Sequence, residues 1–185
     1  MIKNKLVRTA ITYGVLAALA CSFYLLVLYI FGANSFGRYK QMYFGIYAVF
    51  FMLGMQHYRD KINNLKITAQ QALGLGFILN FVAVLSYGIL VSTTLTFVDT
   101  ENLALKRHQS QLEELLDSTR KTLLEHQDEV LEETGKTISQ LEKEYEENII
   151  AIGKITNWDL TQDLLIGLIA SGIFFTFLFM LIFKT

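Results

Sequence analysis

The sequence predicts an all-α polytopic membrane protein with four transmembrane helices and an extramembrane antiparallel helical hairpin between the third and the fourth. Four stretches contain no Asp, Glu, Lys or Arg, and a helix that crosses the hydrocarbon core of a bilayer needs about 20 apolar residues. A charge-rich segment separates the last two stretches and carries 16 acidic and seven basic residues. The uncharged stretches are residues 9–37, 41–58, 67–98 and 164–183, and the charged segment is 99–163.

The composition supports a membrane protein. Apolar residues make up 52% of the chain and aromatic residues 13%, and the mean hydropathy is positive, whereas a soluble domain of this size carries more charge. Outside the charged segment the chain holds nine basic residues and a single acidic one, Asp60. No basic surface of the kind that binds nucleic acid is present. The lone cysteine, Cys21, excludes an intramolecular disulfide.

The first stretch has two interpretations. Lys3, Lys5 and Arg8 before an apolar run also begin a secretory signal, and residues 18–21 resemble a cleavage site. A cleavage site ends the apolar segment, whereas here the apolar run continues through residues 22–31. We therefore expect an uncleaved membrane anchor.

The other three stretches differ in length. The last, 164–183, is a simple span, and 67–98 is longer than one crossing needs, so we expect its helix to tilt or protrude. The second, 41–58, is the weakest candidate. It becomes long enough if Arg38 and Lys40 lie in its first turn and reach outward to the membrane surface.

The basic residues of the short loops predict the orientation. If both termini are cytoplasmic, seven of these residues lie inside and only Arg38 and Lys40 lie outside, as the positive-inside rule favours. Residues 99–157 then face outward, into a periplasm if the cell has an outer membrane. The seven inside are Lys3, Lys5, Arg8, Arg59, Lys61, Lys66 and Lys184.

The periodicity of the charged segment predicts a hairpin. Apolar residues recur at helical spacing in two series, and the chain must return to the membrane, so it has to reverse between them. Gly135 suits a helix C-cap, and Thr137 with Gln140 fits a capping box for the returning helix. The two series are Leu105, Leu112, Leu116, Leu123, Val130 and then Ile138, Leu141, Tyr145, Ile149, Ile152.

We expect Gly153 to end the returning helix and Asn157 to cap the last one, in a hairpin roughly 35–50 Å tall. The chain then divides, within one integrated unit, into 1–98 with three transmembrane helices, 99–157 with the hairpin, and 158–185 with the fourth transmembrane helix.

The outgoing helix carries a second set of apolar residues, Leu115, Leu124 and Leu131, beside its main series. The main series is expected to pack against the returning helix. The second edge leads to the hypothesis that the hairpin self-associates or docks on another envelope protein.

The polar residues of the hairpin are interpreted as surface groups. His108 and His126 are about 27 Å apart along one helix, too far to share a metal. Acidic residues near the tip attract divalent cations only if their oxygens converge, so a solvated helix face is the favoured interpretation. We expect no metal, no cofactor and no catalysis. These acidic residues are Glu125, Asp128, Glu129, Glu132 and Glu133.

Within the bilayer, the spans carry no ionised residue that could run a proton relay. Asn80 is the deepest strong hydrogen-bonding residue, and we expect it to bond a neighbouring helix. Small residues at a spacing of four allow helices to approach closely. They are Gly14, Ala18 and Ser22, then Ala72 and Gly76, and then Gly167 and Ser171.

Tyr58, Arg59 and Asp60 close the second stretch and are candidates for a cytoplasmic contact. The favoured interpretation is a positive-inside anchor in which Asp60 balances Arg59. Alternatively, Arg59 binds an anionic lipid headgroup or a protein partner.

Three motifs resemble a bacterial membrane family: Tyr13-Gly14, Tyr58-Arg59-Asp60, and the segment Ile67-Thr68-Ala69-Gln70-Gln71-Ala72-Leu73-Gly74. The family is the domain-of-unknown-function 4199 family, found mainly in Bacteroidota, and the similarity extends over essentially the full chain. The resemblance implies an inner-membrane location and supplies no substrate.

Two functional hypotheses follow. The first is a non-enzymatic membrane scaffold or accessory subunit that makes protein contacts through the hairpin. The alternative is a small oligomeric transporter or channel with a path near Asn80, Ser86, Ser92, Thr93 and Thr94. A weaker third hypothesis is an envelope-stress sensor.

Overall fold

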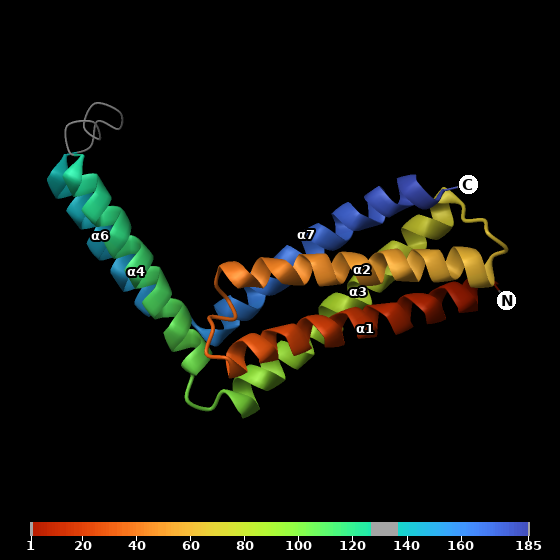
Figure 1. Cartoon of the computed structure of the whole chain (residues 1–185), viewed down its shortest axis with the longest axis horizontal. Helices are drawn as coiled ribbons and strands as arrows, with labels where there is room; N and C mark the ends of the chain where they lie inside the picture. The colour runs from red at the N-terminus through yellow and green to blue at the C-terminus, as the bar shows by residue number, and fades with distance from the viewer. Residues whose placement is uncertain (1, 127–136, 185) are drawn as a thin grey trace.

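The computed structural model of the chain describes residues 2–126 and 137–184. These residues contain no strand, so the predicted all-α class is confirmed. Six α-helices make up most of the described part (Figure 1): α1 Ile2–Ile30, α2 Met42–His57, α3 Ala69–Thr93, α4 Leu103–Glu125, α6 Ile138–Gly153 and α7 Asn157–Phe183.

Four of the helices form a bundle, and the other two project from one of its ends. α1 packs along α3, α3 along α7, and α2 lies against α1 and α7. α4 and α6 lie side by side and lead away from the bundle at an angle (Figure 1). Both termini lie at the opposite end of the bundle. We call the pair α4 and α6 the arm.

Three helices are long and apolar enough to cross a membrane: Lys5–Ile30, Ala69–Val98 and Asn157–Phe183. The second of these combines α3 with the π-helical turn η3, Thr94–Val98. α2 has 16 residues, fewer than the roughly 20 that one crossing needs. Arg38 and Lys40 do not lie in its first turn; they belong to a separate 3₁₀ turn, η1 (Arg38–Gln41), directly before it.

The core of the bundle is rich in aromatic side chains. α2 buries Tyr43, Tyr47, Phe51 and Met55 completely or almost completely. Their spacing of four residues places them on one helix face. Tyr87 of α3 is also fully buried. One face of α2 is therefore part of the core even though the helix is short.

Small residues lie where the helices approach one another most closely. A Cβ atom added to Gly14 would lie 2.9 Å from the carbonyl oxygen of Leu79, and one added to Gly76 would lie 2.7 Å from the Thr176 side chain. At Gly167 the nearest atom would be the Tyr43 hydroxyl, at 2.5 Å.

The remaining predicted packing residues differ in their surroundings. Ala18 and Ala72 are buried. The half-buried Ser171 donates a hydrogen bond to Leu168 in its own helix, over 3.1 Å.

The predicted helix boundaries of the arm are mostly confirmed. Thr137 and Gln140 form the expected capping box, and α6 ends at Gly153. The predicted turn at Gly135 lies outside the described residues. The apolar seam between α4 and α6 is only half-buried: α6 has no buried residue, and α4 has one, Ala104 at its base.

The predicted cap of the last helix is wrong. Thr156, and not Asn157, precedes α7, because Thr156 has the extended backbone that an N-cap requires. Its hydroxyl accepts a hydrogen bond from the Asp159 amide over 3.3 Å, and Asp159 accepts one from the Thr156 amide over 2.8 Å. Asn157 instead donates to the side chain of Asn102, over 2.8 Å.

Candidate functional site

The base of the arm is joined to the bundle by a network of polar contacts and is the candidate functional site. Here α4 meets the end of α1, the loop before α2 and the start of α7 (Figure 1). The residues of this junction are Tyr29, Asn34, Phe36, Lys40, Asp99, Asn102, Arg107, His108, Gln111, Asn157 and Asp163.

Asp99 anchors the start of α4. Its side chain is 1% exposed. One carboxylate oxygen accepts the Leu103 amide over 2.7 Å, and the other accepts the Ala104 amide over 2.9 Å. The Tyr29 hydroxyl donates a third bond, over 3.2 Å. The carboxylate therefore satisfies the free amides of the first turn, stabilises the helix dipole and ties α4 to α1.

The sequence pattern did not reveal Asp99 because it precedes α4 by four residues. Asn102, the residue directly before the helix, has a left-handed backbone with φ of 53° and makes no cap with its own side chain. This turn brings Asp99 back to the first amides of the helix. Only the folded loop creates that geometry.

Arg107, one turn further along α4, binds the end of α1. Its guanidinium donates to the Tyr29 carbonyl oxygen over 3.0 Å and lies 5.4 Å from the centre of the Tyr29 ring. The carbonyl groups of a final helical turn lack partners within the helix and attract cations. Arg107 therefore joins the arm and the bundle through a charge-assisted bond and a cation–π contact.

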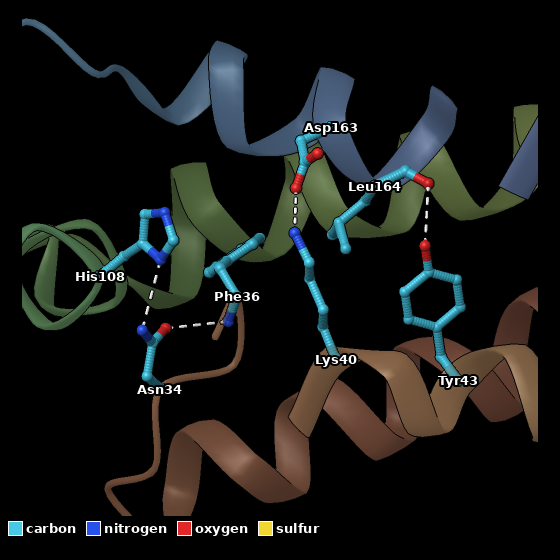
Figure 2. A network of polar contacts seen from close by, with 7 residues as sticks. All are labelled: Asn34, Phe36, Lys40, Tyr43, His108, Asp163 and Leu164. Carbon is cyan, nitrogen blue, oxygen red and sulfur yellow. Dashed lines mark hydrogen bonds and ion pairs between the residues drawn. The ribbon is translucent and has the colours of Figure 1, made fainter. Parts of the chain in front are cut away.

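Asn34 makes the central contact of the junction (Figure 2). Its side-chain oxygen accepts the Phe36 amide over 2.9 Å, so its Nδ2 atom points towards α4. There Nδ2 bonds the side-chain oxygen of Gln111 and lies 3.3 Å from Nδ1 of His108. Because an amide nitrogen only donates, this contact is a hydrogen bond when His108 Nδ1 accepts, which requires the neutral ring with its proton on Nε2.

His108 was expected on the surface, and that prediction is wrong. The ring is half-buried and meets Phe36 edge-on, with ring centres 6.4 Å apart. This burial lowers the pKa of His108 below its ordinary value, and the nearby Lys40 lowers it further, while Asp163 acts in the opposite direction. The sequence did not reveal this burial because the loop that covers this face of α4 comes from residues more than 70 positions away.

Two contacts join the start of α2 to α7 beside this cluster. Lys40 forms an ion pair with Asp163, and the Tyr43 hydroxyl donates to the Leu164 carbonyl oxygen over 3.4 Å (Figure 2). Lys40 is therefore held at the junction and interacts with α7.

Two of the three leucines of the predicted second edge, Leu115 and Leu124, border adjoining grooves between α4 and α6 that share Leu116, Thr119 and Asn148. Leu115 is 57% exposed and borders an open groove between α4 and α6 together with Leu112 and Ile152. Leu124 lines the other groove, with Tyr145. Leu131 lies outside the described residues.

Tyr58, Arg59 and Asp60 lie at the other end of the bundle, in the π-helical turn η2 (Tyr58–Ile62). Tyr58 is fully buried. Arg59 forms an ion pair of 2.6 Å with Asp60, and its guanidinium lies 5.0 Å from the Phe183 ring at the end of α7. The hydrogen bond and charge of Arg59 hold the pKa of Asp60 below its usual value. The predicted charge balance between Arg59 and Asp60 is confirmed.

Asn80 bonds two neighbouring helices, as the sequence predicted. It is 7% exposed, accepts the Tyr47 hydroxyl over 2.6 Å, and donates to the Ile169 carbonyl oxygen over 3.4 Å. It lies directly against Gly172, a small residue that the sequence analysis did not single out. Asn80 therefore serves in helix packing within the single chain.

The other polar residues of the transport hypothesis lie nearer the arm end. Ser92 and Thr93 border an open groove between α3 and α7, which Trp158 and Thr161 also line. Ser86 is half-buried. The Thr94 hydroxyl bonds the Leu90 carbonyl oxygen of the same helix over 2.8 Å.

Metal ligands do not converge in the described residues, where no group of three His, Cys, Asp or Glu side chains could hold an ion. Most of the predicted acidic cluster, Asp128, Glu129, Glu132 and Glu133, lies outside the described residues. The donors of the junction bond its own side-chain and backbone acceptors, and these bonds fix the arm to the bundle.

Comparison with known proteins gives one relationship. No curated protein and no solved structure matches the chain. A family model described as a protein of unknown function matches residues 12–185, nearly the whole chain. The chain therefore belongs to the DUF4199 family.

Proposed function

We propose that the protein is a non-enzymatic scaffold or accessory subunit of a bacterial inner membrane. In this proposal the bundle crosses the bilayer four times, both termini are cytoplasmic, and the arm projects into the periplasm as an antiparallel hairpin that contacts another protein. The single observation that carries the proposal is the arm: it is fixed at its base and has an incompletely buried apolar seam along its length.

The burial of α2 supports a fourth crossing. One of its faces belongs to the aromatic core, while its exposed residues include the apolar Met42, Val49, Met52 and Leu53. Exposed apolar side chains on a helix between membrane-spanning neighbours suit contact with lipid. η1 extends the helix by one further turn at its start.

Contacts along the arm support the antiparallel hairpin. From the base of α4 outward, Gln109 donates to the Ile152 carbonyl oxygen over 3.1 Å, and Arg120 pairs with Glu142 over 3.3 Å. Between them, the Tyr145 hydroxyl bonds Asp117. The partner number in α6 falls as the number in α4 rises, which is the order that an antiparallel pair requires.

The exposed apolar residues of the arm support protein contact. Two helices alone cannot enclose a core, so the seam stays open to solvent. Leu115 of α4 and Ile138 and Ile150 of α6 are largely exposed. A second copy of the chain or another envelope protein would cover such a surface.

Site-specific photo-crosslinking in native membranes tests this function. A photoreactive residue at position 115 should give a covalent adduct, and its mass distinguishes a second copy from another protein. Glu113, two positions earlier and also exposed, provides the matched control and should give little adduct. Absence of an adduct at 115, or equal adducts at both positions, would argue against a contact through the seam.

Cysteine labelling tests the four crossings. In a Cys21→Ser background, single cysteines replace Arg38, Lys61 or Glu113, and intact cells are treated with a membrane-impermeant maleimide. Positions 38 and 113 should react, whereas position 61 should react only after the membrane is opened. Reaction of 38 and 61 from the same side would mean that α2 does not cross the bilayer.

The alternative function is an oligomeric transporter or channel. The groove between α3 and α7 supports this alternative. Its hydroxyl groups come from Ser92, Thr93 and Thr161, and it is open at the surface of one chain. A path would form if another subunit closed it. Purified protein in liposomes should then conduct ions or solutes, and Ser92→Leu should abolish the flux. If the protein is a scaffold, neither the wild type nor Ser92→Leu should give a flux.

A further inference from the structure

An open pocket lies at the end of the bundle that carries the termini, far from the arm. The start of α1 and the end of α2 form it, with one residue from η2. It contains about 690 Å³ of empty space, part of it open to solvent. Its lining residues are Lys5, Arg8, Thr9, Thr12, His57 and Ile62.

The charge of this pocket is uncompensated. Lys5 and Arg8 are exposed, and the ion pairs formed by the described residues do not include either of them. None of the lining residues is acidic. Asp60, the sole acidic residue of the first 98, is already paired with Arg59. The pocket therefore carries a positive potential that favours an anion.

The donors of the pocket suit a phosphate group. An arginine guanidinium presents a planar fork that matches phosphate oxygens, and a lysine ammonium adds a compact charge. The hydroxyls of Thr9 and Thr12 already donate their protons to the backbone oxygens of Lys5 and Arg8, each over 2.9 Å, so the side chains of Lys5 and Arg8 provide the donors for a phosphate. His57 adds ring nitrogens at the opposite wall and packs against Tyr13, with ring centres 5.7 Å apart.

The surroundings of the pocket indicate where the phosphate comes from. α1 continues from the pocket into a candidate membrane span. One and two turns beyond Thr12, on the helix face that lines the pocket, it exposes the apolar Leu16 and Leu19. A headgroup in the pocket would leave its acyl chains beside such residues, whereas free phosphate would gain nothing from them. Basic pockets between transmembrane helices are known sites for anionic headgroups.

We infer that the pocket between the start of α1 and the end of α2 binds the phosphate of an anionic phospholipid headgroup. This site is separate from Arg59, whose charge is engaged by Asp60 and Phe183. It gives the bundle a specific lipid contact at the end opposite the arm.

Lipid retention by the purified full-length protein tests the inference. The protein in detergent is mixed with phosphatidylglycerol or phosphatidylcholine, and bound lipid is counted by native mass spectrometry, so membrane orientation does not matter. The wild type should retain phosphatidylglycerol preferentially. The double variant Lys5→Gln/Arg8→Gln should lose about 25-fold in affinity, or about fivefold for each cation.

Two further variants separate a pocket from a general basic surface. Lys61→Gln/Lys66→Gln removes the same charge from exposed residues that do not line the pocket, and it should retain the lipid within about twofold. Thr12→Trp fills the pocket without changing charge and should weaken binding as the double variant does. A melting curve for each variant confirms that the bundle is folded.

Three results would overturn the inference. Equal losses in both double variants would indicate non-specific attraction to a basic surface. Retention of phosphatidylglycerol by Thr12→Trp would place the lipid elsewhere. Displacement of the lipid by inorganic phosphate at comparable concentration would identify a free anion as the ligand.

Discussion

Asn80 and Gly172 illustrate how single residues position the helices of the bundle. Asn80 accepts the Tyr47 hydroxyl of α2 and donates to α7, and it lies directly against Gly172. A polar side chain at this depth needs partners because a lone amide in an apolar environment is costly. The absence of a side chain at position 172 leaves the room that Asn80 occupies.

We therefore expect Gly172→Ala to destabilise the bundle. Its Cβ would overlap with the side-chain oxygen of Asn80, and overpacking of this kind costs about 1–3 kcal/mol. A lowered midpoint of thermal unfolding in detergent would show it. Gly45→Ala is the matched control, because a Cβ there meets nothing within 4 Å and alanine favours a helix by up to about 1 kcal/mol.

We expect His108 to make the attachment of the arm depend on pH. In the folded protein, burial and the nearby Lys40 favour the neutral form of the ring, which can accept a bond from the Asn34 amide. Asp163 favours the charged form. The pKa of His108 is below the ordinary value of 6.5, so the unfolded chain takes up the proton first as the pH falls. The contribution of His108 to the free energy of unfolding is therefore fully present above pH 6.5 and is lost as the pH falls below that value.

The expected result is faster hydrogen exchange at the base of α4 at pH 5.5 than at pH 7.5, after correction for the intrinsic rate. His108→Gln should reduce this difference because its side chain does not titrate. An identical pH response in the variant would assign the effect to another group. His126→Gln is the control: it replaces an exposed histidine and should leave the pH response unchanged.

At the scale of the elements, the start of α4 depends on a residue outside the helix. Asp99 accepts two amides of its first turn and the Tyr29 hydroxyl. α6 and α7 begin instead with capping boxes made from adjacent residues. Of the three helix starts, that of α4 is therefore the one that depends on the folded bundle.

Asp99→Ala should loosen both the first turn of α4 and its attachment to α1. Loss of a capping side chain costs about 0.5–2 kcal/mol, and the buried amides of the turn would be left without partners. Hydrogen exchange at residues 103–106 should rise. Tyr29→Phe removes only the hydroxyl contact and should have the smaller effect; equal effects would mean that capping contributes nothing measurable.

At the scale of the whole molecule, the arm has a fixed direction relative to the bundle. Contacts from α1, from the loop before α2 and from α7 meet α4 at its base. Further out, α4 packs along α6 and leads away from the bundle (Figure 1). The arm is therefore held at one end, as the proposed contact with a partner protein requires.

We expect Asn34→Ala to broaden the distribution of arm directions. The substitution removes the bonds to Gln111 and His108 together. Spin labels at exposed positions of the bundle and of the outer arm, such as Tyr39 and Thr122, should report a wider distance distribution. Lys40→Ala is the contrasting variant, because an ion pair with an exposed partner contributes about 0–1 kcal/mol. Equal widths in wild type and Asn34→Ala would contradict the fixed attachment.

The sequence alone determined the helical class, the three long apolar helices, the capping box at Thr137 and the end of α6 at Gly153. These features depend on residues within one turn or one helix, so periodicity and composition reveal them. The cap of α7 could also have been predicted from the sequence, because Thr156 and Asp159 have the spacing of a capping box.

The tertiary structure decided which distant residues meet. The contacts of Asp99 with Tyr29, of His108 with Asn34 and of Asn80 with Gly172 join segments far apart in the chain. Such pairs depend on the rotation and axial register of each helix against its neighbours, which packing over the whole bundle sets. A single sequence records the composition of each helix but not that register, and the junction at the base of the arm is a property of the assembled fold.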